Sequence, residues 1–175
     1  EIYVPSFYDV VYEDSGKIAN RIKLYDKAPD VIKKRIIKDL NKSYFPDKII
    51  VPFIETVHDR IVLEIFRGCT RGCRFCQAGM IYRPVREKSV ETLLAQTELL
   101  LDSTGHEEIS LSSLSTGDYS KLIELSQALL DKYEERRIGL SLPSLRLASI
   151  TFGLIERVQK VRKSGLTFAP EGGSE

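Results

Sequence analysis

Residues 61–76 read Ile-Val-Leu-Glu-Ile-Phe-Arg-Gly-Cys-Thr-Arg-Gly-Cys-Arg-Phe-Cys, an apolar run of strand type that leads directly into three cysteines. Cys69, Cys73 and Cys76 have the spacing C-x3-C-x2-C, and the 175-residue chain contains no other cysteine. Sites in parallel α/β sheets gather at the carboxyl ends of the strands. The loop that follows this strand is therefore where we expect a functional site.

The number of thiols favours an iron-sulfur cluster with one open iron. A 4Fe–4S cluster takes four thiolates, one for each iron, so a loop with three leaves one iron free for a group that is not protein. A structural zinc ion needs four ligands, and His58 lies too far upstream for a compact zinc-finger spacing. A disulfide would leave one cysteine over, and no secretory segment is present. Three inert buried thiols remain the other alternative, which a loop rich in Gly and Arg does not favour.

Outward from this loop, strands alternate with amphipathic helices. Ser89 predicts the start of the first helix as its N-cap, and Gly105 predicts its end. Alternation of this kind predicts right-handed βαβ units, an α/β class and a parallel sheet. The predicted strands are Ile61–Phe66, Glu108–Leu114, Ile138–Leu142 and Leu166–Ala169, and the predicted helices are Ser89–Thr104, Asp118–Arg136 and Ser149–Ser164.

The first third of the chain has a different pattern. Phe7–Glu13 and Ile18–Tyr25 are rich in aromatic and β-branched residues on either side of an Asp-Ser-Gly-Lys turn, which predicts a β-hairpin. Apolar residues at helical spacing predict a helix at Val31–Leu40, and a further strand is expected at Ile49–Phe53. We therefore predict an α+β connector over residues 1–58 and a core over 59–175.

Composition narrows the class of protein. With 26 Lys+Arg against 25 Asp+Glu the net charge is +1, so the broad positive field of a dedicated nucleic-acid binder is not expected, although RNA stays open as a substrate. The chain has no apolar stretch near the roughly 20 residues that span a bilayer, and no export signal. Reduced thiols predict a cytoplasmic location. Because the first residue is Glu1 and the Gly-rich end has no following helix, we expect a fragment of a longer protein.

The cysteine motif resembles that of the radical SAM superfamily, whose members share C-x3-C-x-aromatic-C with an aromatic residue where this chain has Phe75. Five longer segments resemble a group of uncharacterised proteins within this superfamily, namely Val4–Tyr8, Phe66–Cys73, Leu111–Tyr119, Ser141–Arg146 and Leu166–Glu171. The resemblance implies the first half of a (β/α)6 barrel, a partial barrel of TIM type. It also implies that Cys69, Cys73 and Cys76 bind a 4Fe–4S cluster and that reductive cleavage of S-adenosylmethionine (SAM) yields a 5′-deoxyadenosyl radical, which acts on an unknown substrate.

The resemblance also indicates residues that contact SAM or the substrate. Ser113, Ser115 and Asp118 follow the second strand, where family members contact the amino group of SAM, although Asp118 could simply be the N-cap of the next helix. Ser144 and Arg146 follow the third strand, and a guanidinium there suits a carboxylate of SAM or substrate.

Two further features of the site are expected with their alternatives. The same resemblance implies that Glu171 hydrogen-bonds SAM or the substrate, while a Pro-Glu-Gly-Gly turn needs no function. Arg67, Arg71 and Arg74 flank the cysteines and would offset the negative charge of a cluster, although a solvated loop tolerates them equally.

Within the superfamily the chain resembles uncharacterised proteins that carry a cobalamin-binding-type domain before the barrel. On this resemblance the hairpin region joins the two domains, and cobalamin stays open for the full-length parent. A neighbouring group, the methylthiotransferases, modifies tRNA or a ribosomal protein. The family implies an electron donor such as flavodoxin or ferredoxin. The alternative of a different class is an iron-sulfur module without catalysis.

Overall fold

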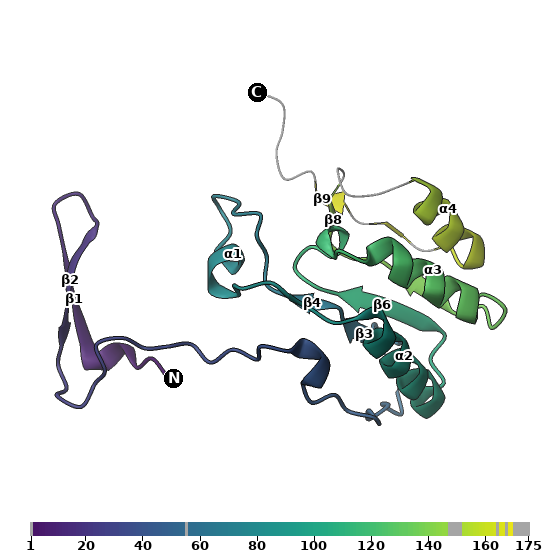
Figure 1. Ribbon diagram of the computed structural model, residues 1–175, viewed down its shortest axis with the longest axis horizontal. Coiled ribbons are helices and arrows are strands. Elements are labelled where there is room, and N and C mark those ends of the chain that lie inside the picture. Colours follow the sequence, from purple (N-terminus) through teal and green to yellow (C-terminus); the bar gives the residue numbers. More distant parts are fainter. Residues whose placement is uncertain (1, 55, 147–151, 164, 167, 170–175) are drawn as a thin grey trace. The chain divides into compact units, whose positions relative to one another are not determined.

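The computed structural model of the chain describes residues 2–54, 56–146, 152–163, 165–166 and 168–169 (Figure 1). Within it the chain forms two compact units, residues 1–37 and 38–175. The predicted domain boundary, with a connector over residues 1–58 and a core over 59–175, stays a prediction.

The first unit contains the predicted hairpin. After a 3-10 turn, η1 (Pro5–Phe7), strand β1 (Tyr8–Tyr12) pairs antiparallel with β2 (Ile18–Lys23). Gly16 provides the positive φ of 78° in the turn, whose closing bond runs from the Glu13 amide to the Lys17 carbonyl at 2.8 Å. The hairpin prediction is confirmed. Most of its side chains are exposed, and Tyr8 and Ala28 are the buried apolar residues among those described in this unit.

Two predicted elements downstream of the hairpin are wrong. Residues 31–39 form no helix, and only a 3-10 turn, η2 (Leu40–Lys42), lies at the end of the predicted range. Amphipathic helices gain most of their stability from packing of the apolar face, yet Val31 and Ile37 are exposed. The strand predicted at Ile49–Phe53 is also not formed, and its Ile50 and Phe53 side chains are fully exposed. A strand needs a pairing partner as well as β propensity.

The second unit contains the predicted parallel sheet. Its strands β3 (Ile61–Glu64), β6 (Glu108–Ser112) and β7 (Gly139–Ser141) lie in the order β3-β6-β7. The register pairs Leu63 with Leu111 and Ile109 with Leu140. Alternating side chains of these strands enter a core in which Leu63, Leu111 and Leu125 are completely buried.

Helices α2 (Val90–Thr104) and α3 (Leu122–Tyr133) supply the other wall of that core. The ends of α2 are as predicted, because Ser89 Oγ accepts a hydrogen bond from the Thr92 amide at 3.3 Å and Gly105 adopts a left-handed φ of 71°. Helix α3 begins later than predicted: a 3-10 turn, η3 (Thr116–Asp118), comes first. The described part of the third predicted helix is α4 (Phe152–Val161).

The carboxyl ends of the sheet are extended by short segments. Beyond Pro143 the chain resumes as β8 (Leu145–Arg146), which pairs in parallel with β9 (Phe168–Ala169), so the fourth predicted strand joins β8. Strand β4 (Phe66–Arg67) pairs antiparallel with β5 (Arg86–Glu87), and a one-turn helix, α1 (Ala78–Ile81), lies between them (Figure 1). The architecture is mixed α/β with a parallel sheet. No helix in the described part of the chain is both long and apolar enough to cross a bilayer.

Candidate metal and cofactor site

The cysteine loop is residues 68–77, which leave β4 at the carboxyl end of the sheet and lead into α1. The β4-β5 pair closes its base. Gly68 has a φ of 97°, and a Cβ there would lie 2.8 Å from both the Tyr82 and the Pro84 carbonyl oxygens. The loop can therefore begin this close to the returning chain only with glycine at that position.

The three thiols line one cavity of about 210 Å³ together with residues from two other connections. Cys69, Cys73 and Cys76 form no disulfide and are half-buried. The cavity is also lined by residues that follow β6 and β7, namely Leu114, Ser115, Ser144, Leu145 and Arg146. The loop after the first strand thus meets the ends of the next two strands, which is the arrangement that parallel sheets use for binding sites.

The arrangement of donors suits a cluster better than a single metal ion. Among the described residues, no three His, Cys, Asp or Glu side chains form a group that could hold one ion. A single ion draws all its ligands to one point, whereas a cubane takes one thiolate on each of several irons and accepts sulfurs that stand further apart. Cys69, Cys73 and Cys76 line one cavity, which fits the separate thiolate ligands that a 4Fe–4S cluster takes.

Arg146 brings positive charge to this cavity. Its Nη1 lies 3.7 Å from Cys73 Sγ, within hydrogen-bonding distance for sulfur. The residue lies on β8, directly after the strand break at Pro143, and Ser144 in that break has a positive φ of 56°. The Ser144 carbonyl accepts a hydrogen bond from the Thr116 amide at 3.2 Å. This bond ties the connection after β7 to the one after β6.

Asp118 is not a helix cap. It lies in η3, and α3 begins only after Lys121, which has no capping side chain. Instead its carboxylate forms a two-pronged ion pair with Arg71 of the cysteine loop, with Arg71 Nε 2.7 Å from Oδ2 and Nη2 bonded to Oδ1. Hydrogen bonds from Arg71 hold the pKa of Asp118 below its usual value, and the Ser115 hydroxyl and the charge of Arg146 act in the same direction. The same pair raises the pKa of Arg71.

The remaining predicted residues divide between the cavity wall and other positions. Phe75 lines the cavity but is 76% exposed. Ser115 lines it and is only 4% exposed, and apart from its proximity to Asp118 its hydroxyl has no well-formed hydrogen bond within the described structure. Ser113 is not among the described lining residues and bonds to Thr116 Oγ1 at 3.1 Å. Glu171 lies outside the described residues.

The three arginines of the loop have different surroundings. Arg71 lines the cavity. Arg67 is bound to Glu64 three residues earlier, at 2.6 and 2.8 Å, and this contact raises its pKa. Arg74 is exposed. Sequence reasoning led to the same expectation for all three arginines, and it did not predict the Arg71–Asp118 pair, because 47 positions separate the two residues.

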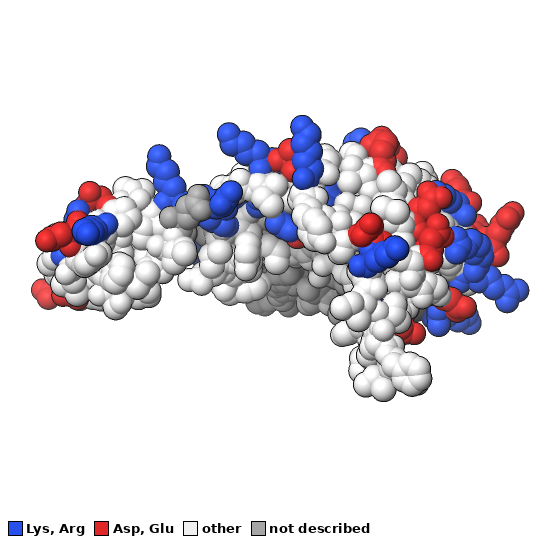
Figure 2. Space-filling model, turned by 90° about the horizontal axis from the view of Figure 1, so that it is seen from below, with Lys and Arg blue, Asp and Glu red and all other residues white. Residues whose placement is uncertain are grey.

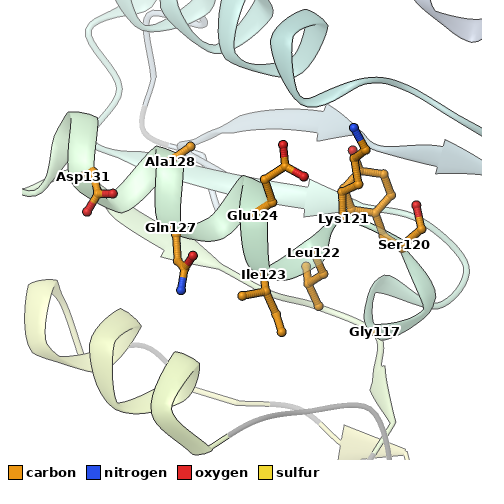
Figure 3. Close-up of a pocket in the computed structure, with 10 residues that line it drawn as sticks. Gly117, Ser120, Lys121, Leu122, Ile123, Glu124, Gln127, Ala128 and Asp131 are labelled. Atoms are coloured by element: carbon orange, nitrogen blue, oxygen red, sulfur yellow. The ribbon is translucent and has the colours of Figure 1, made fainter.

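A larger cavity than the one at the cysteines lies elsewhere in the described structure. A cavity of about 640 Å³ runs along the outer side of α3, where Lys121, Glu124 and Asp131 project (Figure 3). None of its described lining residues is a cysteine. Blue and red side chains are intermixed at the right-hand end of Figure 2. The smaller cavity is the candidate site because of its chemistry.

The fold and the cavity define an α/β protein with a three-thiol site at the carboxyl ends of its strands. The model of the radical SAM superfamily matches residues 63–175, so the chain belongs to that superfamily. It is 32% identical over 185 aligned positions to an uncharacterised protein of Methanocaldococcus jannaschii, covering 98% of this chain and 40% of that protein. It is also 29% identical over 114 positions to the ribosomal protein uS12 methylthiotransferase RimO of Protochlamydia amoebophila, covering 60% of this chain and 24% of the relative. The chain spans less than half the length of either relative.

Proposed function

We propose that this chain is the cluster-binding part of an enzyme that cleaves SAM reductively. The observation that carries the proposal is that Cys69, Cys73 and Cys76 line one cavity together with residues that follow β6 and β7. Three thiolates leave one iron of a 4Fe–4S cluster without a protein ligand. The chemistry of such a centre is one-electron reduction of the SAM sulfonium, which gives methionine and a 5′-deoxyadenosyl radical. The parallel strands would then be the first half of a (β/α)6 barrel.

The chain's own residues supply the groups that an amino-acid moiety needs. Arg146 offers a guanidinium for the SAM carboxylate. The Ser115 hydroxyl and the free lone pairs of Asp118 can accept from the ammonium, because a carboxylate bound by one arginine keeps acceptor capacity. Phe75 and Ser144 line the space beside them. Ser113 and Glu171 stay in the proposal on the resemblance alone.

The activity of the whole protein reaches beyond these residues. The similarity to a ribosomal protein methylthiotransferase favours, as a second candidate, transfer of a methylthio group to RNA or protein. We assign an electron donor of flavodoxin or ferredoxin type and a reducing cytoplasm on the same family grounds. Cobalamin in the full-length protein rests on the resemblance alone.

The test is production of 5′-deoxyadenosine. The full-length protein is reconstituted anaerobically with iron and sulfide, reduced with dithionite and supplied with SAM. We expect 5′-deoxyadenosine in the native protein and none above background in Cys76→Ala, which removes one cluster ligand. A protein that binds the cluster yet forms no more 5′-deoxyadenosine than this variant would support the non-catalytic iron-sulfur module instead.

A further inference from the structure

We propose that the Arg71–Asp118 ion pair is a positioning pair that fastens the cysteine loop to the connection between β6 and α3. The inference rests on the proposed function, in which the loop must hold a cluster. The pair joins segments 47 positions apart through two parallel hydrogen bonds. Two-pronged contacts between guanidinium and carboxylate fix direction as well as distance. This geometry allows the pair to restrict the position of the loop.

The position of Arg71 in the loop makes this contact effective. Arg71 lies midway between Cys69 and Cys73, two residues from each. Two residues of chain span at most about 7 Å, so fixing Arg71 confines both neighbouring thiols. The Cys76 amide donates a local hydrogen bond to the Cys73 carbonyl at 3.0 Å, within the loop itself. A side-chain link from the loop to another connection adds order that such a local bond does not provide.

The surroundings of the pair distinguish it from an ordinary surface ion pair. The Asp118 side chain is 18% exposed and that of Arg71 45%, so water competes for the carboxylate only in part. The Ser115 hydroxyl also lowers the pKa of this carboxylate. The pair is neutral as a unit, so it orders the loop without adding net charge, whereas Arg146 supplies positive charge beside Cys73.

The first experiment measures hydrogen–deuterium exchange of residues 68–77 in the cluster-free, full-length protein. Arg71→Gln and Asp118→Asn each break the pair, and we expect exchange in the loop to become about tenfold faster. The charge swap Arg71→Asp with Asp118→Arg should return it to within about threefold of the native rate. Arg67→Gln is the matched control, because Arg67 also makes a two-pronged contact, but to Glu64 only three residues earlier in the chain. It should leave the exchange of residues 69–77 unchanged.

The second experiment measures how fast the reconstituted cluster is lost to an iron chelator. Both single variants should lose it about tenfold faster, the range expected when groups that orient metal ligands are removed, and the swap should recover most of the loss. Thermal unfolding like that of the native protein shows that a variant is folded. A variant that does not fold is replaced by Arg71→Lys, which keeps the charge. Single variants that match Arg67→Gln in exchange overturn the proposal, as does a folded swap that behaves like the single variants. Failure of SAM cleavage alone would overturn the proposed function and leave the exchange result intact.

Discussion

Gly68→Ala should damage the cysteine loop more than any other glycine replacement for which the structure describes the neighbours. The added Cβ would lie 2.8 Å from the Tyr82 and Pro84 carbonyl oxygens and 3.0 Å from the Val85 Cα. These are backbone atoms, so no side chain can rotate away. Left-handed backbone costs an alanine about 1–2 kcal/mol, and overpacking adds about 1–3 kcal/mol. The expected loss is about 2–5 kcal/mol in the free energy of unfolding.

Gly105→Ala is the matched control for this prediction. Gly105 also has a positive φ, 71°, but nothing lies within 4 Å of the Cβ it would gain. Its free energy of unfolding should fall only by the cost of the left-handed backbone, about 1–2 kcal/mol. Urea unfolding followed by circular dichroism measures both variants, and iron bound after reconstitution measures the loop itself. If Gly68→Ala is destabilised no more than Gly105→Ala and binds native amounts of iron, the close approach described for this loop is wrong.

Three further substitutions test the core around the site. Tyr119→Phe removes the hydroxyl that donates to the Lys88 carbonyl at 2.8 Å, and it should lower the free energy of unfolding in urea by about 1–3 kcal/mol. Burial raises the pKa of Tyr119 to about 12, so the native protein should lose stability between pH 10 and 12. This loss should disappear in the variant. Burial lowers the pKa of Lys88, whose Nζ bonds to Gln96 at 3.0 Å, so native stability relative to Lys88→Met should rise as the pH approaches 10.5 from below, and a flat difference would contradict the buried amine. Leu125→Ala, at a completely buried position, should cost about 2–5 kcal/mol in the same assay, whereas a loss below 1 kcal/mol would show that α3 is not packed on the sheet.

Helix α2 shows what the sequence could predict. Ser89 and Gly105 are local signals, since a cap bonds within one turn and a left-handed glycine needs no distant partner. The βαβ alternation likewise predicted the parallel sheet and the placement of the cysteine loop at its carboxyl end. The range 31–40 had an equally regular apolar spacing, but Ile36 and Ile37 on its apolar face are exposed, and spacing alone does not hold a helix.

The position of the candidate site at the strand ends could be predicted from the sequence, but the contacts between its residues could not. Cys69, Cys73 and Arg146 could be assigned to strand ends from the order of the elements, and the structure places them around one cavity. The partner of Asp118 could not be found, because an ion pair across 47 positions depends on how two loops meet in space. The N-cap alternative for Asp118 failed because η3 displaces the start of α3.

The electron paramagnetic resonance spectrum of the reduced full-length protein tests the central claim most directly, when it is recorded before and after addition of SAM. A cluster held by Cys69, Cys73 and Cys76 has one iron open to the amino and carboxylate groups of SAM. We therefore predict that SAM changes the spectrum, and that Cys76→Ala shows no such response. An intact cluster whose spectrum is identical with and without SAM would contradict the account.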